Sequence, residues 1–335
     1  MDSLSAAAEA TYIPLQFSQT GVVICDRSNW GLISVRGEDR QRYLHNQSTN
    51  DFQQLKSGRG CETVFVTSTA RTIDLATAYV TDESILLLVS PCQTTSLLTW
   101  LDRFIFPLDR VELKDISADY DLFTIMGAKS NDLLAKLGVD ALKQDSKYYH
   151  QLAEIGGITL RIAVGTDLAI PGYNLIVPHS AAAQIWSVIT AAGATPLGQK
   201  NWESWRIQQG RPLPGKELTE DYNPLEAGLW HTISFNKGCY IGQETIARLN
   251  TYKGVKQRLW GLKLNKLVDT GIKVELEAKK VGKVTSCINS LEGIFALAYV
   301  KTTAGEADTV VQVAGEDTPL LNLPFITHKY YQPEN

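Results

Sequence analysis

The sequence predicts an α+β protein that ends in a small antiparallel β-barrel. Up to residue 253, short apolar runs typical of strands mix with amphipathic helical runs, without strict strand–helix alternation. Beyond residue 253 helical spacing is nearly absent, and five or so short strand-like runs are separated by turn residues. We therefore expect an α+β region over residues 1–253 and a barrel domain over residues 254–335.

The first elements are predicted from short apolar runs bounded by turn residues. Residues 21–26 and 31–36 are predicted strands, and a helix is expected to open at 37–40 with acids in its first turn and to end near 48–51. A second helix is predicted from apolar residues spaced i, i+3, i+4, i+7 and i+8 over 97–105. Further strands are predicted at 62–67, 72–80, 84–90, 111–116, 121–126, 158–164 and 172–177, and further helices at 132–137, 181–192 and 202–209.

The C-terminal strands are predicted from alternation of apolar and polar residues. Ile272, Val274 and Leu276 alternate with charged residues, which is the period-two pattern of a half-buried strand. The predicted barrel strands are 257–264, 272–278, 280–285, 293–300 and 309–313.

Composition excludes several classes of protein. The chain has 335 residues, 44% hydrophobic and 20% charged, and its net charge of -4 gives no overall basic footprint for nucleic acid. Its 5 cysteines are far apart and form no Cys-x-x-Cys pair, which argues against a disulfide framework or a zinc site and suits a reducing compartment. The N-terminus shows no signal or transit peptide, and no apolar run approaches the ~20 residues of a membrane span, so we expect a cytoplasmic protein without a membrane partner.

The run that places the most functional groups close together is Lys-Gly-Cys-Tyr-Ile-Gly-Gln-Glu at residues 237–244. Glycine before Cys239 would let backbone or ligand approach the sulfur closely. Lys237 would favour the thiolate, as would the N-terminus of the short helix predicted from Gln243. The alternative is that Cys239 is a small buried hydrophobe in a tight turn.

This run resembles the signature of the YgfZ folate-binding family, whose members are relatives of the aminomethyltransferase T-protein of the glycine cleavage system. The stretch 37–51 is also similar to a Gly-x-Asp-Arg…Leu-x-x-x-x-Thr-Asn-Asp pattern of that family. The resemblance implies two interleaved α+β domains and a C-terminal barrel around a folate channel. It also implies tetrahydrofolate, or a one-carbon derivative, as cofactor, and iron–sulfur enzymes or their assembly proteins as partners, including enzymes of tRNA modification.

The resemblance also supplies site candidates. Cys239 would be the reactive thiol, with Lys237 and Gln243 tuning or orienting it. Arg206 lies in a Trp-Arg-Ile-Gln-Gln-Gly run similar to the Leu-Arg-x-Glu-x-Gly helix end whose arginine lies in the folate channel. From its residues alone, Arg206 is either stacked in a pocket or a snorkelling surface side chain.

Four further cofactor-binding candidates are less specific. Asp74 is a lone acid near the Asp-Asp pair of the T-protein group, and it is equally an outward-facing strand residue, because a buried carboxylate is costly. Asn174 stands where that group carries a glutamate for the pterin ring. Tyr173 and Tyr240 would line a pterin slot or belong to the core. Glu226, in the run that leads to residues 237–244, completes the candidate set; no histidine spacing indicates a metal site.

Three functions follow from these candidates. The first is a tetrahydrofolate-binding accessory protein that supports assembly or repair of iron–sulfur enzymes. The second is a folate-dependent aminomethyl- or methyltransferase, for which Asp74 is the candidate acid; the changes at Asn174 and Gln208 argue against a true glycine cleavage T-protein. The third is an RNA- or protein-binding scaffold that uses the basic residues Lys253, Lys256 and Arg258.

Overall fold

The computed structural model describes residues 11–140, 142 and 147–332. Residues 1–10, where no leader peptide is predicted, lie outside the described residues. The chain forms two compact units, and each combines segments that are far apart in the sequence. Unit 1 consists of Met1–Gln47, Asp51–Thr63 and Ala76–Trp202, and unit 2 consists of Ser48–Asn50, Val64–Leu75 and Glu203–Asn335.

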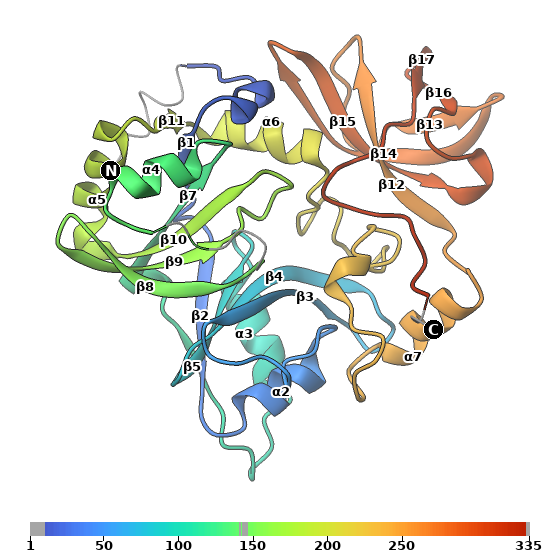
Figure 1. Ribbon diagram of the computed structural model, residues 1–335. Coiled ribbons are helices and arrows are strands. Elements are labelled where there is room, and N and C mark those ends of the chain that lie inside the picture. Colours follow the sequence, from blue (N-terminus) through green and yellow to red (C-terminus); the bar gives the residue numbers. More distant parts are fainter. Residues whose placement is uncertain (1–10, 141, 143–146, 333–335) are drawn as a thin grey trace. The chain divides into compact units, whose positions relative to one another are not determined.

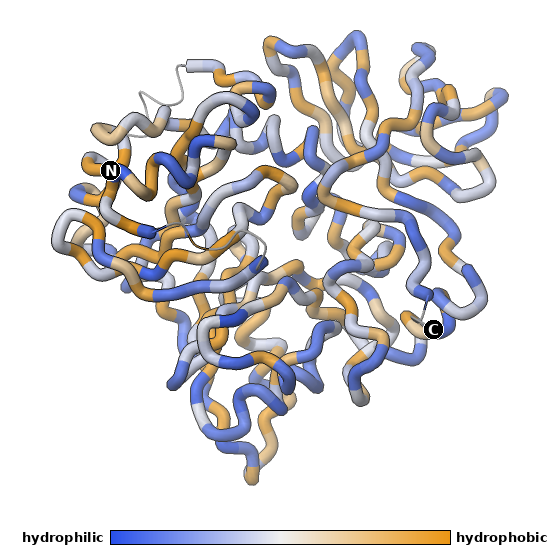
Figure 2. The backbone as a smooth tube through the Cα atoms, viewed as in Figure 1, coloured by the Kyte–Doolittle hydropathy of each residue, from blue (hydrophilic) through white to orange (hydrophobic). Residues whose placement is uncertain are grey.

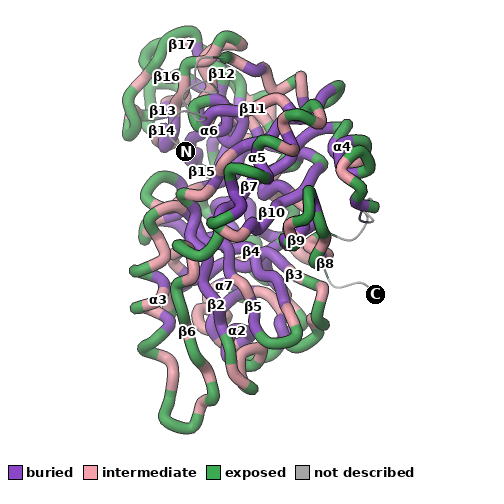
Figure 3. The backbone as a smooth tube through the Cα atoms, turned by 90° about the vertical axis from the view of Figure 1, so that its left-hand side faces the viewer, coloured by how far each residue is buried: buried purple, intermediate pink, exposed green. Residues whose placement is uncertain are grey.

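The first sheet belongs to unit 1 and has the strand order β11-β1-β7-β10-β9-β8 (Figure 1). Neighbouring strands are antiparallel except β1 and β11, which are parallel. Apolar residues of α4 (Ser130–Lys136) and α5 (Ala182–Ala191) bury one face of the sheet, and Trp186 meets Phe123 edge-on at 5.3 Å. Figure 3 shows buried residues along β7 and β10 at its centre. The strands are β1 (Val23–Asp26), β7 (Tyr120–Met126), β8 (His150–Ile155), β9 (Ile158–Val164), β10 (Gly172–Pro178) and β11 (Thr195–Leu197).

The second sheet has the order β3-β4-β5-β2-β6, and α2 and α3 pack against it. The Tyr43 hydroxyl of α2 donates a hydrogen bond of 2.6 Å to the Leu101 carbonyl of α3. The end of β3 and the start of β4 fall within Val64–Leu75, so both strands contribute residues to both units. The strands are β2 (Gly31–Arg36), β3 (Arg59–Val66), β4 (Thr72–Val80), β5 (Ser84–Val89) and β6 (Glu112–Asp115).

The third sheet is the C-terminal part of unit 2 and has the order β12-β15-β14-β13-β16-β17, antiparallel throughout. It curls into a half-barrel, because Gly261 of β12 pairs with Leu321, which lies just beyond the last strand. Figure 2 shows apolar and polar residues alternating along these strands. The strands are β12 (Gln257–Leu264), β13 (Lys273–Leu276), β14 (Lys279–Ser290), β15 (Gly293–Lys301), β16 (Val310–Val313) and β17 (Glu316–Pro319).

The sequence predictions for individual elements are largely confirmed. The α+β class is confirmed, and so is the helix-poor C-terminal sheet, in which the described part of the chain beyond β12 contains one short 3-10 turn at Thr302–Ala304. The helix predicted to open with acids at 37–40 is wrong in detail, because α2 begins at Arg40 and Glu38 and Asp39 precede it. Strands β8, β11 and β17 were not predicted. The helices are α2 (Arg40–Gln47), α3 (Thr94–Asp102), α4 (Ser130–Lys136), α5 (Ala182–Ala191), α6 (Gln199–Gln209) and α7 (Gln243–Thr251).

The division at residue 253 and the separate barrel domain stay predictions, because unit 2 contains the half-barrel together with residues 203–256. Within the described residues, no helix combines the length and the hydrophobicity that crossing a membrane requires.

Candidate functional site

The candidate residues fall in both units. Unit 1 contains Tyr173 and Asn174. Unit 2 contains the other candidates, which are Asp74, Arg206, Glu226, Lys237, Cys239, Tyr240 and Gln243.

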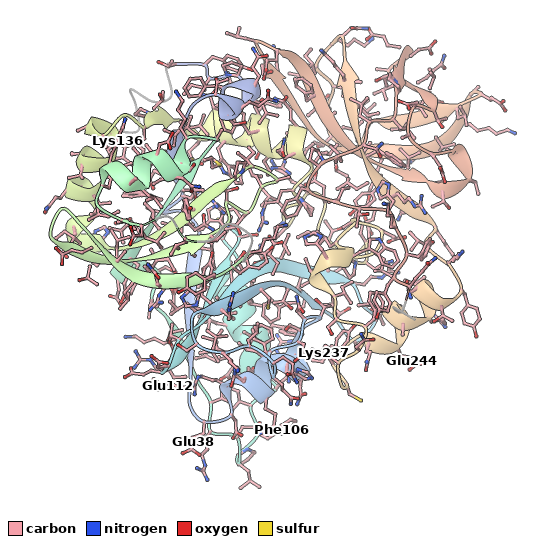
Figure 4. All side chains as sticks on the ribbon, in the orientation of Figure 1. Glu38, Phe106, Glu112, Lys136, Lys237 and Glu244 are labelled. Carbon is pink, nitrogen blue, oxygen red and sulfur yellow. The ribbon has the colours of Figure 1, made fainter. Side chains whose placement is uncertain are left out.

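The signature loop, residues 233–242, connects a short 3-10 turn at Trp230–Thr232 to α7 (Figure 4). Gly242 caps α7 at φ 83°, a left-handed conformation that glycine adopts without strain. A Cβ at Gly242 would lie 2.8 Å from the Thr67 carbonyl oxygen, so only glycine fits this close approach. Cys239 is exposed three residues before this cap, and Gln243 is the first residue of α7. The alternative of a buried filler at Cys239 is therefore wrong.

Lys237 anchors the loop from within unit 2. Its ammonium donates hydrogen bonds to the carbonyl oxygens of Ser48, at 2.8 Å, and Asn50, at 2.7 Å. It also lies 4.7 Å from the ring centroid of Tyr240, and only 8% of Lys237 is exposed. The structure thus brings Lys237 and Tyr240 together, and Tyr240 belongs to the core cluster of the unit. The charge of Lys237 is directed at carbonyls and a ring, and its effect on the thiol stays a prediction.

The segment Ser48–Asn50 explains why the Thr-Asn-Asp pattern accompanies the signature. The Thr49 hydroxyl donates to the Thr232 carbonyl at 2.8 Å and accepts from the Val64 amide at 2.9 Å. The Ser234 amide in turn donates to the Thr49 carbonyl at 3.0 Å. These bonds hold Thr49, the middle residue of the segment, against Thr232 and Ser234 at the start of the loop. Thr49 lies in the stretch that carries the resemblance, but nothing in its own sequence marks it as a site residue.

The last residues of the chain hold the other side of the loop. The Tyr331 ring stacks on Phe235 at 4.7 Å between centroids, and its hydroxyl donates to Asn236 at 3.1 Å. Its backbone amide donates to the side chain of Asn250 in α7 at 3.0 Å. No sequence pattern indicated this contact between the chain end and the loop.

Arg206 is the centre of a buried ion network in unit 2. It is 0% exposed, and its Nε and Nη2 atoms donate to the two carboxylate oxygens of Glu203 at 2.7 and 2.8 Å. Nη1 donates to Glu217 at 3.1 Å and to the Arg211 carbonyl at 2.6 Å, and Nη2 also donates to Ser286 at 3.1 Å. Burial lowers the pKa of Arg206, but Glu217 and Glu203 outweigh it and raise that pKa above its ordinary value.

This network uses every N–H group of the Arg206 guanidinium, which has five donors. The interpretation of Arg206 as a snorkelling surface residue is wrong. In this arrangement the side chain holds α6 to β14, and it has no donor left for a ligand. Glu217, which is also 0% exposed, was missed because nothing in the local sequence marks it as the partner of Arg206.

Asp74 and Glu226 are both buried acids. Asp74 is 0% exposed and accepts a hydrogen bond of 2.8 Å from the Leu75 amide, so the expectation that it faces outward is wrong. Glu226 is 6% exposed and accepts from the Asn223 amide at 3.1 Å. Burial raises the pKa of Glu226 above its usual value, although the Asn223 amide and the side chain of Gln257 act in the other direction. Their part in folate binding stays a prediction.

Tyr173 and Asn174 cannot serve one face of the sheet, because successive residues of a strand point to opposite sides. Tyr173 of β10 faces the helix-covered core, where it is 0% exposed and its hydroxyl donates to the side chain of Asn131. Asn174 faces the other side, where it accepts from Thr124 at 2.8 Å and donates to Tyr79 at 3.1 Å and Asp167 at 3.0 Å.

Asn174 belongs to a buried polar cluster of unit 1 that the sequence did not reveal. At its centre Arg27 Nη1 lies 2.8 Å from Asp167 Oδ2, and the two side chains are 0% and 1% exposed. The Arg27 guanidinium also stacks over Trp30 at 3.8 Å, and Thr77 donates to the second Asp167 oxygen at 2.6 Å. Asn174 and Asp167 are 7 residues apart, but Thr124 and Asn174 are 50 apart and Arg27 and Asp167 are 140 apart, so no local motif indicates the cluster.

His150 gives a prediction for the pH dependence of stability. It is 1% exposed, and its Nδ1 accepts from Arg161 at 2.8 Å. Burial, and then the charge of Arg161, lower the pKa of His150 to about 4 from 6.5. The unfolded chain takes up this proton near pH 6.5 and the folded chain only near pH 4, so neutral His150 stabilises fully above pH 6.5. We expect this histidine to account for about 3 kcal/mol of stability lost as the pH falls from 6.5 to 4.

Urea unfolding at pH 7.5, 6, 5 and 4 would measure this effect. Carboxylates titrate in the same range, so the comparison is with His150→Gln, which does not titrate. The variant should lose less free energy of unfolding than the wild type between pH 7.5 and 4. Equal losses would contradict the assignment of the lowered pKa.

In the described residues, no three His, Cys, Asp or Glu side chains come together as a metal site would require. All five cysteines are free.

The fold is first of all that of an aminomethyltransferase. The crystal structure of the glycine cleavage system aminomethyltransferase T from Bartonella henselae matches 94% of this chain and 89% of its own, with a TM-score of 0.79 at 19% sequence identity. The family model "GCVT N-terminal domain" matches residues 14–237. The chain therefore belongs to the GCVT family.

Two relatives show the range of the family. The Arabidopsis thaliana protein named "Putative transferase At1g60990, chloroplastic" is 45% identical over 299 residues, 89% of this chain and 69% of that protein. The aminomethyltransferase of Thermoanaerobacter pseudethanolicus is 25% identical over 319 residues, 92% of this chain and 85% of that protein. The predicted kinship with aminomethyltransferases is confirmed, and the narrower YgfZ assignment stays a prediction.

Proposed function

We propose that this protein binds tetrahydrofolate, or a one-carbon derivative, and supports the assembly or repair of iron–sulfur enzymes through the thiol of Cys239. The observation that carries the proposal is the signature loop. Its thiol is exposed, while the backbone on either side is fixed by Lys237 and by the Gly242 cap. A fixed, accessible thiol is what chemistry at a sulfur atom needs, whereas a merely structural cysteine would be buried.

The folate part of the proposal needs polar atoms that can bind a pterin ring. Arg206 and Asn174 fit poorly, since their polar atoms already have protein partners. Unit 2 offers two others: in the described part of the chain, the buried Gln209 Oε1 acceptor and Trp230 Nε1 donor have no hydrogen-bond partner. We propose that these atoms help to hold the folate, which would supply or accept a one-carbon group.

The Cys239→Ala variant tests the role of the thiol. We expect it to fold and to bind tetrahydrofolate like the wild type, but to fail to complement a strain that lacks the homologous protein. Cys92→Ala is a matched control, since Cys92 is also exposed but lies outside the signature loop. Full complementation by Cys239→Ala would remove the thiol from the mechanism, and wild-type protein that binds no reduced folate would remove the cofactor.

A folate-dependent aminomethyl- or methyltransferase is the second candidate, because the family and the names of both relatives favour it. Its candidate acid, Asp74, is enclosed rather than open to a substrate. Turnover of an aminomethyl-lipoyl carrier protein would favour the transferase, and its absence the accessory function.

Two further proposals concern the domain arrangement of the protein and its cellular compartment. We propose the interleaved arrangement of the α+β region, and a reducing compartment, which the five free cysteines favour. The sequence favours the cytoplasm, whereas the Arabidopsis relative is named chloroplastic.

A further inference from the structure

A cavity of about 510 Å³ lies in unit 1, and none of the candidate residues discussed above lines it. Strands of both sheets of the unit line it. β2 and β5 contribute Ser34, Arg36 and Leu86, and β9 and β10 contribute Arg161 and Ile176.

Strand register explains why these side chains converge. Ser34 is directly opposite Leu86, and Arg36 is opposite Ser84, so these four share one face of the second sheet. On the first sheet, Arg161 of β9 is opposite Ile176 of β10. This pair lies on the face away from the helix-covered core, since the neighbouring residues Leu160 and Leu175 belong to that core.

Arg161 is the charged group at this cavity. Its side chain is only partly exposed, and Nη1 donates to His150 at 2.8 Å. Within the described residues it forms no ion pair, and it is not fixed by a second hydrogen bond. Burial lowers the pKa of Arg161 and outweighs the opposing influence of Tyr120 and Asp82, so the guanidinium is largely kept from water. Its remaining N–H groups can donate two parallel hydrogen bonds to one anion.

Ser34 supplies an independent observation. It is 2% exposed, it lines the same cavity, and in the described part of the chain its hydroxyl has no hydrogen-bond partner. A buried hydroxyl without a partner is destabilising, so native structures rarely retain one unless a ligand or water completes it.

We propose that this cavity binds a small organic monoanion whose carboxylate or phosphate group contacts Arg161 and Ser34. The charges of the lining favour a ligand with a single negative charge. Arg36 and Arg161 are matched in number by Asp82 and Glu83, so the lining has no excess positive charge that would balance a second negative charge on the ligand. Leu86 and Ile176 provide an apolar wall for the rest of the ligand. The site is independent of the folate proposal.

Ligand-observed NMR on the full chain can test the site with two probes, butyrate and inorganic phosphate. We expect dissociation constants on the order of 1 mM for ligands this small. Arg161→Gln should weaken binding at least about tenfold, because a charge-assisted pair is lost. Ser34→Ala should weaken it by about two- to fivefold. Arg103→Gln removes the same charge from the exposed end of α3 and should leave affinity unchanged.

The two probes distinguish the chemistry of the natural ligand. Tighter binding of butyrate supports a carboxylate, and tighter binding of phosphate supports a phosphate ester. Binding of neither probe, or equal affinity of wild type and Arg161→Gln, would overturn the proposal. Should circular dichroism show that Arg161→Gln is unfolded, Ser34→Ala decides, since unchanged affinity in that variant also overturns it.

Discussion

The Arg206→Ala variant is expected to lose about 3–5 kcal/mol of unfolding free energy, the usual effect of removing one partner of a buried ion pair. The change leaves the Glu217 carboxylate enclosed with no cation, and both residues are 0% exposed in the wild type. It also removes the contact from α6 to Ser286 in β14. Urea unfolding followed by tryptophan fluorescence would measure the loss.

A control separates this effect from the loss of an ordinary surface ion pair. Lys216 also pairs with Glu203, at 2.7 Å, but its side chain is 44% exposed, so Lys216→Ala should change stability by less than about 1 kcal/mol. The double variant Arg206→Met, Glu217→Gln should lose less unfolding free energy than the sum of the losses of the two single variants. In the double variant both members of the buried ion pair are replaced by uncharged side chains. An Arg206→Ala protein as stable as the wild type would show that the buried ion network of Arg206 does not stabilise the fold.

The Asp167→Asn variant is expected to lose a similar amount, about 3–5 kcal/mol, for the same physical reason in unit 1. Arg27 is 0% exposed, and Asp167 is the carboxylate that balances it, at 2.8 Å. One oxygen of Asp167 also accepts from Asn174 at 3.0 Å, and the other accepts from Thr77 at 2.6 Å, so the amide cannot reproduce all these bonds. Thermal or urea unfolding would show the loss.

Asp115→Asn is a matched control for this prediction. Asp115 is exposed and accepts hydrogen bonds from Ser117 at 2.9 and 2.6 Å, which an asparagine oxygen can also accept. We expect its stability to stay within about 1 kcal/mol of the wild type. Equal stability of the two variants would mean that the buried cluster relaxes around Arg27 once its ion pair with Asp167 is lost.

The strands that were predicted correctly are those whose own residues show a clear hydrophobic pattern. The alternation at Ile272, Val274 and Leu276 and the apolar run at β2 were sufficient, because one face of a strand must be buried wherever it lies. β8 was missed because its residues alternate weakly: Leu152 is exposed and His150 is buried.

The sequence failed to predict the burial of side chains whose partners lie far away in the chain. Asp74 was expected to face outward because a lone buried acid is costly, but its surroundings in unit 2 could not be read from a single strand. The buried position of Arg206 depends on Glu217 and Ser286, the latter 80 residues away. By contrast, the run itself predicted a short helix from Gln243 with Cys239 in the loop before it, and both are confirmed, since α7 begins at Gln243.

The composition of unit 2 has a consequence for synthesis on the ribosome. Residues 64–75 emerge early, whereas the other members of the core cluster that contains Val64, Val66 and Leu75, apart from Ala70, lie beyond Glu203. Chains fold from the N-terminus as domains are completed. These apolar side chains must therefore remain exposed, or be sheltered by a chaperone, until the segment beyond Glu203 has been synthesised.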